Sequence, residues 1–387
     1  MTDTSTIIAY ILLLLTMVVT TSFIPQRKVI TGSENNIKYP LLQYIGACAL
    51  PILIYTLFWG LRADNVGTDY IRYIDHYEYA WYDLQMEEFG EYTFMLLCYG
   101  LSCLGFGYVS MFLATSFINI LSVYVSSWDK GKNVVILSVF FYFCTSSVFF
   151  AQNGIRQAMA SSILLMGLSL IENRKYIAWI ICAIAAFFTH HSSILFALYV
   201  TFIACYKPFR INTIILTAVY VLMEFMGVAL QNALFDNQYS LAIAAILGYE
   251  ENIMMALDEL GEGATYNSGL GIILRMFLNI VLIYFGNKKL KIDDKSYFYI
   301  LFYVYYFGII FERLFEGNMM LNRLAVLFSF AAFPAIALIV DYMIQISRRN
   351  KLYIILVIGV ILGFFLKYYM GCKIGSNGTG FYRMINF

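Results

Sequence analysis

Apolar residues fall in long continuous runs along the chain, separated by short polar connections. A helix that crosses a bilayer needs roughly 20 apolar residues. The apolar run 91–106 is short for a membrane span, so it is expected to form a partial or interfacial helix. The pattern predicts an all-α, polytopic integral membrane protein with about 12–13 transmembrane helices. The runs long enough to span are 5–24, 40–61, 107–126, 134–152, 155–171, 176–189, 192–206, 211–230, 269–286, 296–312, 321–346 and 352–370.

Because the apolar runs follow one another along the chain with mostly short connections, we predict one transmembrane domain over residues 1–387. Positive residues favour cytoplasmic loops, and from residue 128 onward basic clusters recur in every second loop. The alternate connections are then expected outside, together with the segments 62–90 and 371–387. The segment 231–268 contains no Lys or Arg but six acidic residues, which predicts an acidic outer loop that could act as a lid.

Composition agrees with a membrane protein. The chain is 61% hydrophobic and 13% charged, whereas soluble proteins carry about 25% charged residues. The net charge of +1 gives no indication of nucleic-acid binding. The seven cysteines lie mostly inside apolar runs without a CxxC pair, so we interpret them as core residues. No metal or cofactor is predicted, and without a nucleotide-binding motif any reaction must use an already activated substrate.

The most unusual polar stretch is Gln152–Ala160, which carries Arg156 between two apolar runs. No other charged residue occurs between Lys132 and Glu172. An arginine facing lipid costs about 2.5–3.5 kcal/mol on insertion scales. A guanidinium that faces inward binds phosphate through two parallel hydrogen bonds. Arg156 with Gln157 is therefore a candidate anion site; the alternative is a helix-end arginine whose charge reaches the headgroups.

A second polar stretch follows the run 40–61. Asp69 is a candidate general base, and Arg72 and Arg62 are candidate anion contacts. Gly67 permits a tight turn before them. The alternative is a solvated loop with an Asp/Arg pair.

Two of the three histidines, His190 and His191, stand where one apolar run ends and the next begins. Histidine titrates near neutrality, so it can accept a proton from an attacking hydroxyl or pair with phosphate. Adjacent histidines point in different directions on a helix, which does not favour a metal pair. The alternative is an interfacial histidine at a helix end.

The fourth polar stretch, 312–323, contains Arg313 and Arg323 as candidate anion ligands. Glu316 could instead pair with either arginine as part of a structural network. Glu224 and Arg275, both inside apolar runs, are expected to pair with each other in the bundle.

On the predicted topology these four stretches share the outer face. Several arginines, two histidines and a carboxylate on one face suit a polyanionic, membrane-anchored substrate such as a polyprenyl pyrophosphate. A transporter that flips such a lipid is the alternative of another class, and it should bury charge through the whole bilayer depth.

The ordered motifs resemble the EpsG/Wzy family of bacterial polysaccharide (O-antigen) polymerases. The resemblance covers about residues 62–200. It rests on Gly67-Thr68-Asp69-Tyr70, on 155–160, on the Asn-Arg-Lys-Tyr turn at 173–176, and on 186–193, where His190 takes the place of the family's histidine. The doubled histidine leaves open whether His190 or His191 acts.

The resemblance implies a GT-C-like glycosyltransferase of the bacterial inner membrane, with its active site facing the periplasm. It would transfer a growing glycan from undecaprenyl pyrophosphate to the terminal sugar of a new lipid-linked repeat unit. Arg156 and Arg323 would hold the pyrophosphates, supported by Gln157, and His190 or Asp69 would be the base. A chain-length regulator is the protein partner implied. An O-antigen ligase, with the same donor and a lipid A core acceptor, is the alternative enzyme.

Overall fold

The computed structural model describes residues 2–25, 41–86, 90–145, 147–207, 209, 211–235, 269–292, 296–316, 319–348 and 350–385. Over these ranges the regular structure is helical, and the one β-bridge is an antiparallel pairing of Arg62 with Met384. The all-α prediction is confirmed. The predicted acidic lid at 231–268, with its short apolar run Leu241 to Leu247, lies outside the described residues except for 231–235, which end a helix.

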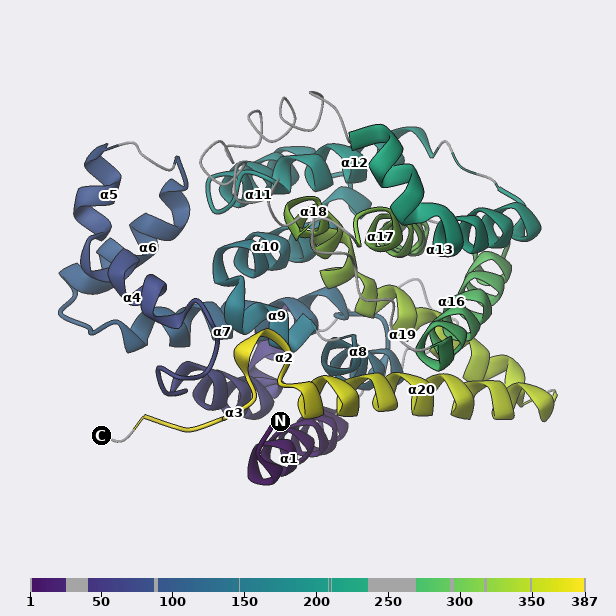
Figure 1. The fold of residues 1–387 in the computed structure, drawn as a ribbon, viewed down its shortest axis with the longest axis horizontal. Coiled ribbons are helices and arrows are strands. Elements are labelled where there is room, and N and C mark those ends of the chain that lie inside the picture. The colour runs from purple at the N-terminus through teal and green to yellow at the C-terminus, as the bar shows by residue number, and fades with distance from the viewer. Residues whose placement is uncertain are drawn as a thin grey trace. The chain divides into compact units, whose positions relative to one another are not determined.

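The chain divides into two compact units, whose helices are labelled in Figure 1. The first contains Met1–His190 and Phe364–Phe387, and the second contains His191–Gly363. The boundaries fall after His190 and within the last long helix. The helices of the first unit are α1 (Thr4–Ser22), α2 (Leu41–Ala47), α3 (Ala49–Gly60), α4 (Tyr70–Glu78), α5 (Ala80–Met86), α6 (Tyr92–Cys103), α7 (Val109–Ser126), α8 (Lys132–Cys144), α9 (Ser147–Asn153), α10 (Ile155–Glu172), α11 (Tyr176–Phe187) and the 3-10 turn η2 (Ser376–Gly378). The second unit holds α12 (Ser193–Tyr206), α13 (Thr213–Phe235), α16 (Gly269–Leu290), α17 (Ser296–Leu314), α18 (Met319–Phe330) and α19 (Ala332–Ser347), and α20 (Leu352–Ile374) runs from it into the first.

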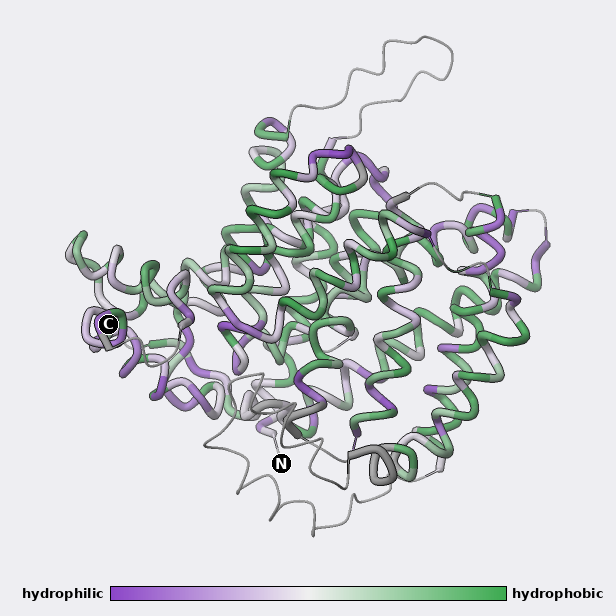
Figure 2. Tube along the Cα trace, turned by 90° about the horizontal axis from the view of Figure 1, so that it is seen from above, coloured by the Kyte–Doolittle hydropathy of each residue, from purple (hydrophilic) through white to green (hydrophobic). Residues whose placement is uncertain are grey.

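Hydrophobic residues run along most helices, as the green stretches of Figure 2 show. Five helices of the described chain are long and apolar enough to cross a membrane, and three bent pairs raise this to eight. Five further apolar helices have 10–17 residues. The chain is therefore a polytopic membrane protein, with five to eight candidate spans in the described part of the chain, fewer than the expected 12–13.

The bent pairs interrupt runs that hydropathy alone joins into single spans. α2 and α3 meet at 62°, and the pair Asn322–Phe330 and Ala332–Ser347 meets at 44°. In each case a proline, Pro51 or Pro334, is the third residue of the second helix. Proline has no N–H to donate four residues back, so it fits the first turn of a new helix better than the middle of an old one.

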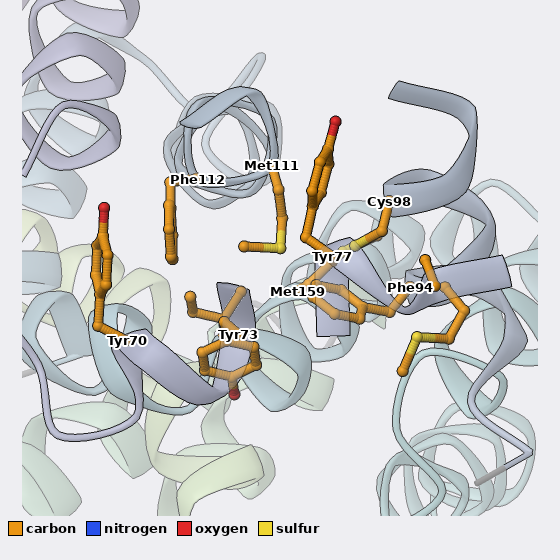
Figure 3. Packing of buried hydrophobic residues seen from close by; sticks show 11 residues of the cluster. Tyr70, Tyr73, Tyr77, Phe94, Cys98, Met111, Phe112 and Met159 are labelled. Atoms are coloured by element: carbon orange, nitrogen blue, oxygen red, sulfur yellow. The ribbon is translucent and has the colours of Figure 1, made fainter. Parts of the chain in front are cut away.

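The segment 62–90, expected as an outer loop, forms two short helices in its described part. α4 buries Tyr70, Tyr73 and Tyr77, at spacings of three and four residues that place them on one helix face. These rings pack with residues of α6, α7 and α10 in one cluster (Figure 3). The run 91–106 forms α6, whose 12 residues extend only about 18 Å. The cluster thus ties the connection rigidly to the first unit.

A close helix contact in this unit depends on Gly60, at the end of α3. A Cβ atom there would lie 2.9 Å from the Cα of Leu113 in α7. We expect Gly60→Ala to lower the Tm in detergent, because α3 and α7 must separate to admit the methyl group. Gly46→Ala in α2 is the control, since nothing lies within 4 Å of a Cβ there. An equal Tm for the two variants would contradict this packing.

The second unit contains a buried polar network. Glu224, whose side chain is fully buried, accepts a hydrogen bond from Arg275 Nε at 2.9 Å, so the expected pair is confirmed. Its other oxygen accepts from Tyr220 at 3.0 Å and lies 4.0 Å from Arg313. Asn279 extends the network by donating to Tyr220 at 2.9 Å. Buried polar groups in such a network stabilise a bundle only when they are paired.

We expect Glu224→Gln to destabilise the second unit by about 3 kcal/mol, the lower end for breaking a buried ion pair, because Arg275 is partly exposed. Thermal unfolding in detergent measures the loss. Lys351→Gln, which removes an exposed charge from the same unit, is the control. Unchanged stability of Glu224→Gln would show that the network contributes no net stability.

Candidate active site

The stretch around Arg156 is a helix break. α9 ends at Asn153 and α10 begins at Ile155, with Gly154 between them. A Cβ on Gly154 would lie 2.5 Å from the ring of Phe150, so a larger residue there would require that ring to move. The break puts Arg156 in the first turn of α10. A cation at that end opposes the helix dipole, so this position requires a nearby anion.

Glu91 supplies that anion. Its Oε2 lies 2.7 Å from Arg156 Nη1, and its Oε1 lies 2.7 Å from His190 Nδ1. The Glu91 side chain is only 8% exposed, against 17% for Arg156 and 14% for His190. One buried carboxylate therefore joins the arginine and the histidine that the sequence analysis selected separately.

Backbone hydrogen bonds hold the carboxylate and the histidine side by side. Thr93 N, in the first turn of α6, donates to the carbonyl of Phe188 just after α11 at 2.9 Å. His190 N in turn donates to Ala186 O at 2.9 Å. The start of α6 and the end of α11 are thus fastened together, and Glu91 and His190 extend from these two ends.

Two titratable groups near Arg156, His76 and Tyr73, are shifted toward their uncharged forms. Burial and then the Arg156 charge lower the pKa of His76, against the raising effect of Asp83. His76 Nδ1 lies 3.3 Å from Asp83 Oδ2. Burial raises the pKa of Tyr73, and the Arg156 charge opposes this rise. Both shifts favour the uncharged forms of His76 and Tyr73 at neutral pH.

Arg62 is held by the protein on all sides. Its guanidinium donates to the carbonyls of Trp59 at 2.7 Å and Val66 at 3.2 Å, and to both the side-chain and backbone oxygens of Gln152 at 3.0 and 3.1 Å. The arginine is 1% exposed. Burial lowers the pKa of Arg62 to about 10, so it keeps its charge at neutral pH. Arg62 therefore joins the 62–69 turn to α9.

The Gly67–Asp69 turn is bound to the same helix break. Asn153 Oδ1 accepts from the Thr68 hydroxyl at 2.7 Å and from the Asp69 amide at 3.1 Å. The Asp69 side chain is half-buried and Arg72 is exposed. Gln157 is buried one residue after Arg156. Asp69 is therefore held at Asn153, three residues before Arg156, whereas Arg72 is exposed.

Three further candidates belong to the second unit. Arg313 is 6% exposed, and its Nη1 lies 2.7 Å from Glu316 Oε2, the local pair considered above. Arg323 is exposed and His191 is half-buried. The joining of Arg156 and Arg323 in one site stays a prediction.

Sequence reasoning missed Glu91 and Asn153. Glu91 stands where an apolar helix begins, and it is the last charged residue before Asp129; that isolation is the signal that could have selected it. Asn153 directly precedes Gly154, the glycine at the helix break. Within the described ranges, no three His, Cys, Asp or Glu side chains form a group that could hold a metal ion.

The fold and the site define a polytopic helical membrane protein in which an Arg–Glu–His group lies at a helix break around the buried carboxylate of Glu91. The model of the EpsG family matches residues 47–382, most of the chain, and the chain belongs to that family. Membership indicates a polysaccharide polymerase role. No curated protein and no solved structure matches.

Proposed function

We propose that the protein extends a lipid-linked polysaccharide by transferring the growing glycan from undecaprenyl pyrophosphate to the terminal sugar of a new lipid-linked repeat unit. The observation that supports this most is the bridge from Arg156 through Glu91 to His190, in a chain of the EpsG family. The three side chains match the needs of glycosyl transfer: a base for the acceptor and a positive charge for the leaving group.

His190 is the general base of this proposal. An ionised carboxylate only accepts hydrogen bonds, so Nδ1 of His190 is the donor toward Glu91. The Nε2 atom of the neutral ring is then the acceptor for a proton. Glu91 fixes this tautomer and stabilises the imidazolium that forms, as carboxylates do for catalytic histidines. Asp69 is the second candidate for the base.

Arg156 stabilises the leaving group. The acceptor hydroxyl oxygen bonds to the anomeric carbon, its proton passes to His190 Nε2, and the carbon–oxygen bond to the pyrophosphate breaks. Negative charge develops on the departing lipid pyrophosphate. A guanidinium has five N–H donors in a planar fork, so it can contact both the Glu91 carboxylate and a phosphate. Glu91 thereby positions the base and the anion ligand together.

The proposal places the site on the periplasmic side of a bacterial inner membrane and includes a chain-length regulator as partner. The side of the membrane rests on the resemblance and on the distribution of basic loops, and the regulator rests on the resemblance alone.

Purified protein in detergent, supplied with lipid-linked repeat units, tests the proposal. We expect products with two or more repeat units, resolved as a ladder by electrophoresis. Detergent leaves no membrane across which a lipid could be flipped, so ladder formation excludes a pure flippase. Absence of any product longer than one repeat, from protein that remains folded, would contradict the proposed activity.

A further inference from the structure

The chain beyond α20 folds back onto the first unit (Figure 1). Ala63 N donates to Arg383 O at 2.8 Å, and Ile385 N donates to Leu61 O at 2.9 Å. These two bonds flank the bridge between Arg62 and Met384. The segment from Ser376 to Ile385, which we name the C-terminal strap, therefore pairs with the connection that leaves α3.

Side chains fasten the strap at further points. The Tyr382 ring stacks on Phe58 with centroids 4.1 Å apart and planes at 6°. Tyr10 of α1 donates to the carbonyl of Thr379 at 2.7 Å, and Thr379 is fully buried. The aromatic stacking and the buried Tyr10–Thr379 hydrogen bond stabilise this packing. The strap is thus part of the folded unit.

The strap touches the turn that carries Asp69. Gly67 N donates to Gly378 O at 3.1 Å. Gly378 has φ +72°, and a Cβ there would lie 2.9 Å from Thr68 N. Thr68 in turn donates its hydroxyl to Asn153. A continuous path of contacts therefore runs from the strap through Gly67 and Thr68 to the last residue of α9, three residues before Arg156.

The geometry points to the C-terminal strap and Asn153 as positioning elements of the active site, which hold the Gly67–Asp69 turn against the helix break that presents Arg156. This inference rests on the proposed function. The strap touches no reacting atom. It acts by setting where α9 ends and α10 begins, and hence where the Arg156 guanidinium meets Glu91. Misplacement of a catalytic group by about 1 Å can cost roughly 10²-fold in rate.

Gly378→Ala tests the strap. The added methyl group would press on Thr68 and push the strap away from the turn. We expect kcat for chain extension to fall about 10²-fold, because Arg156 would no longer be placed to stabilise the leaving group. Gly105→Ala is the matched control: its φ is +80°, so the backbone strain is similar, but nothing lies within 4 Å of its Cβ.

Thr68 provides a second test that perturbs less. Thr68→Val removes the hydroxyl that bonds to Asn153 and keeps the shape, so we expect kcat to fall about three- to tenfold, the value of one net hydrogen bond. Thr68→Ser keeps the hydroxyl and is expected to restore kcat. A purely structural role of the hydroxyl would lower the protein level or Tm of Thr68→Val and leave kcat per folded molecule unchanged.

Either of two results would overturn the inference. One is a kcat of Gly378→Ala equal to that of Gly105→Ala; the other is equal kcat for Thr68→Val and Thr68→Ser. Arg156→Ala, measured in the same assay, separates this inference from the proposed function. If Arg156→Ala is inactive but the strap and Thr68 variants are normal, only the positioning inference fails. If Arg156→Ala extends chains normally, the proposed site fails.

Discussion

Replacing Arg156 with alanine is expected to collapse a ladder of long glycan chains to a single repeat unit. The change removes the guanidinium that stabilises the leaving pyrophosphate, and loss of one such electrostatic contact costs roughly 10²–10³-fold in rate. It also leaves the buried Glu91 without its cationic partner. The ladder is measured in cells that lack their own copy and express the variant at the wild-type level.

Two further variants sharpen this result. Arg156→Lys keeps the charge but loses the planar fork, so we expect little recovery of chain length. Arg174→Ala, at an exposed position two residues beyond the end of α10, should leave the ladder unchanged. A full ladder from Arg156→Ala would mean that the arginine is not needed for the reaction.

Glu91→Gln is expected to have a comparable effect. The amide keeps the size of the side chain but carries no charge, so it neither stabilises an imidazolium on His190 nor fixes the Arg156 guanidinium. General-base catalysis contributes about 10²–10⁴-fold, and we expect kcat of the purified protein to fall within that range. Because a buried arginine loses its counter-charge, stability also falls.

Folding and catalysis must therefore be measured separately for this variant. Protein yield and Tm in detergent report the stability loss, and kcat per folded molecule reports catalysis. Glu78→Gln, at the exposed end of α4, is the matched control. A kcat of Glu91→Gln close to that of wild type would show that the carboxylate serves folding only.

The helical architecture follows from apolar runs, which sequence reasoning handles well, because any segment that crosses lipid must satisfy its own backbone. The bends between paired helices were not predicted, because mean hydropathy does not detect a helix break inside an apolar run. Pro51 and Pro334 carried that information. The same limit applies to Gly154, whose importance lies in the ring of Phe150 beside it.

Arg156 and His190 were predictable because isolated polar groups among apolar residues are costly. Their shared contact with Glu91 was not predictable. Glu91 follows Glu87 and Glu88 within five residues, and sequence alone does not say which carboxylate turns inward. Arg62 shows the converse. Its charge and position suggested an anion ligand, whereas it donates hydrogen bonds to the surrounding carbonyls and so has a structural role. Contacts between residues far apart in the chain, such as Glu91 with His190 and Arg62 with Gln152, contribute to both cases.

The kinetics of one double variant test most directly whether Glu91 and His190 act as a unit. The kcat for chain extension would be measured in detergent for Glu91→Gln, for His190→Gln and for the two changes combined. Groups that act together give non-additive losses, so we predict that the double variant is no slower than His190→Gln alone. If the two losses multiply instead, the carboxylate and the histidine act independently, and the active site is not the bridge described above.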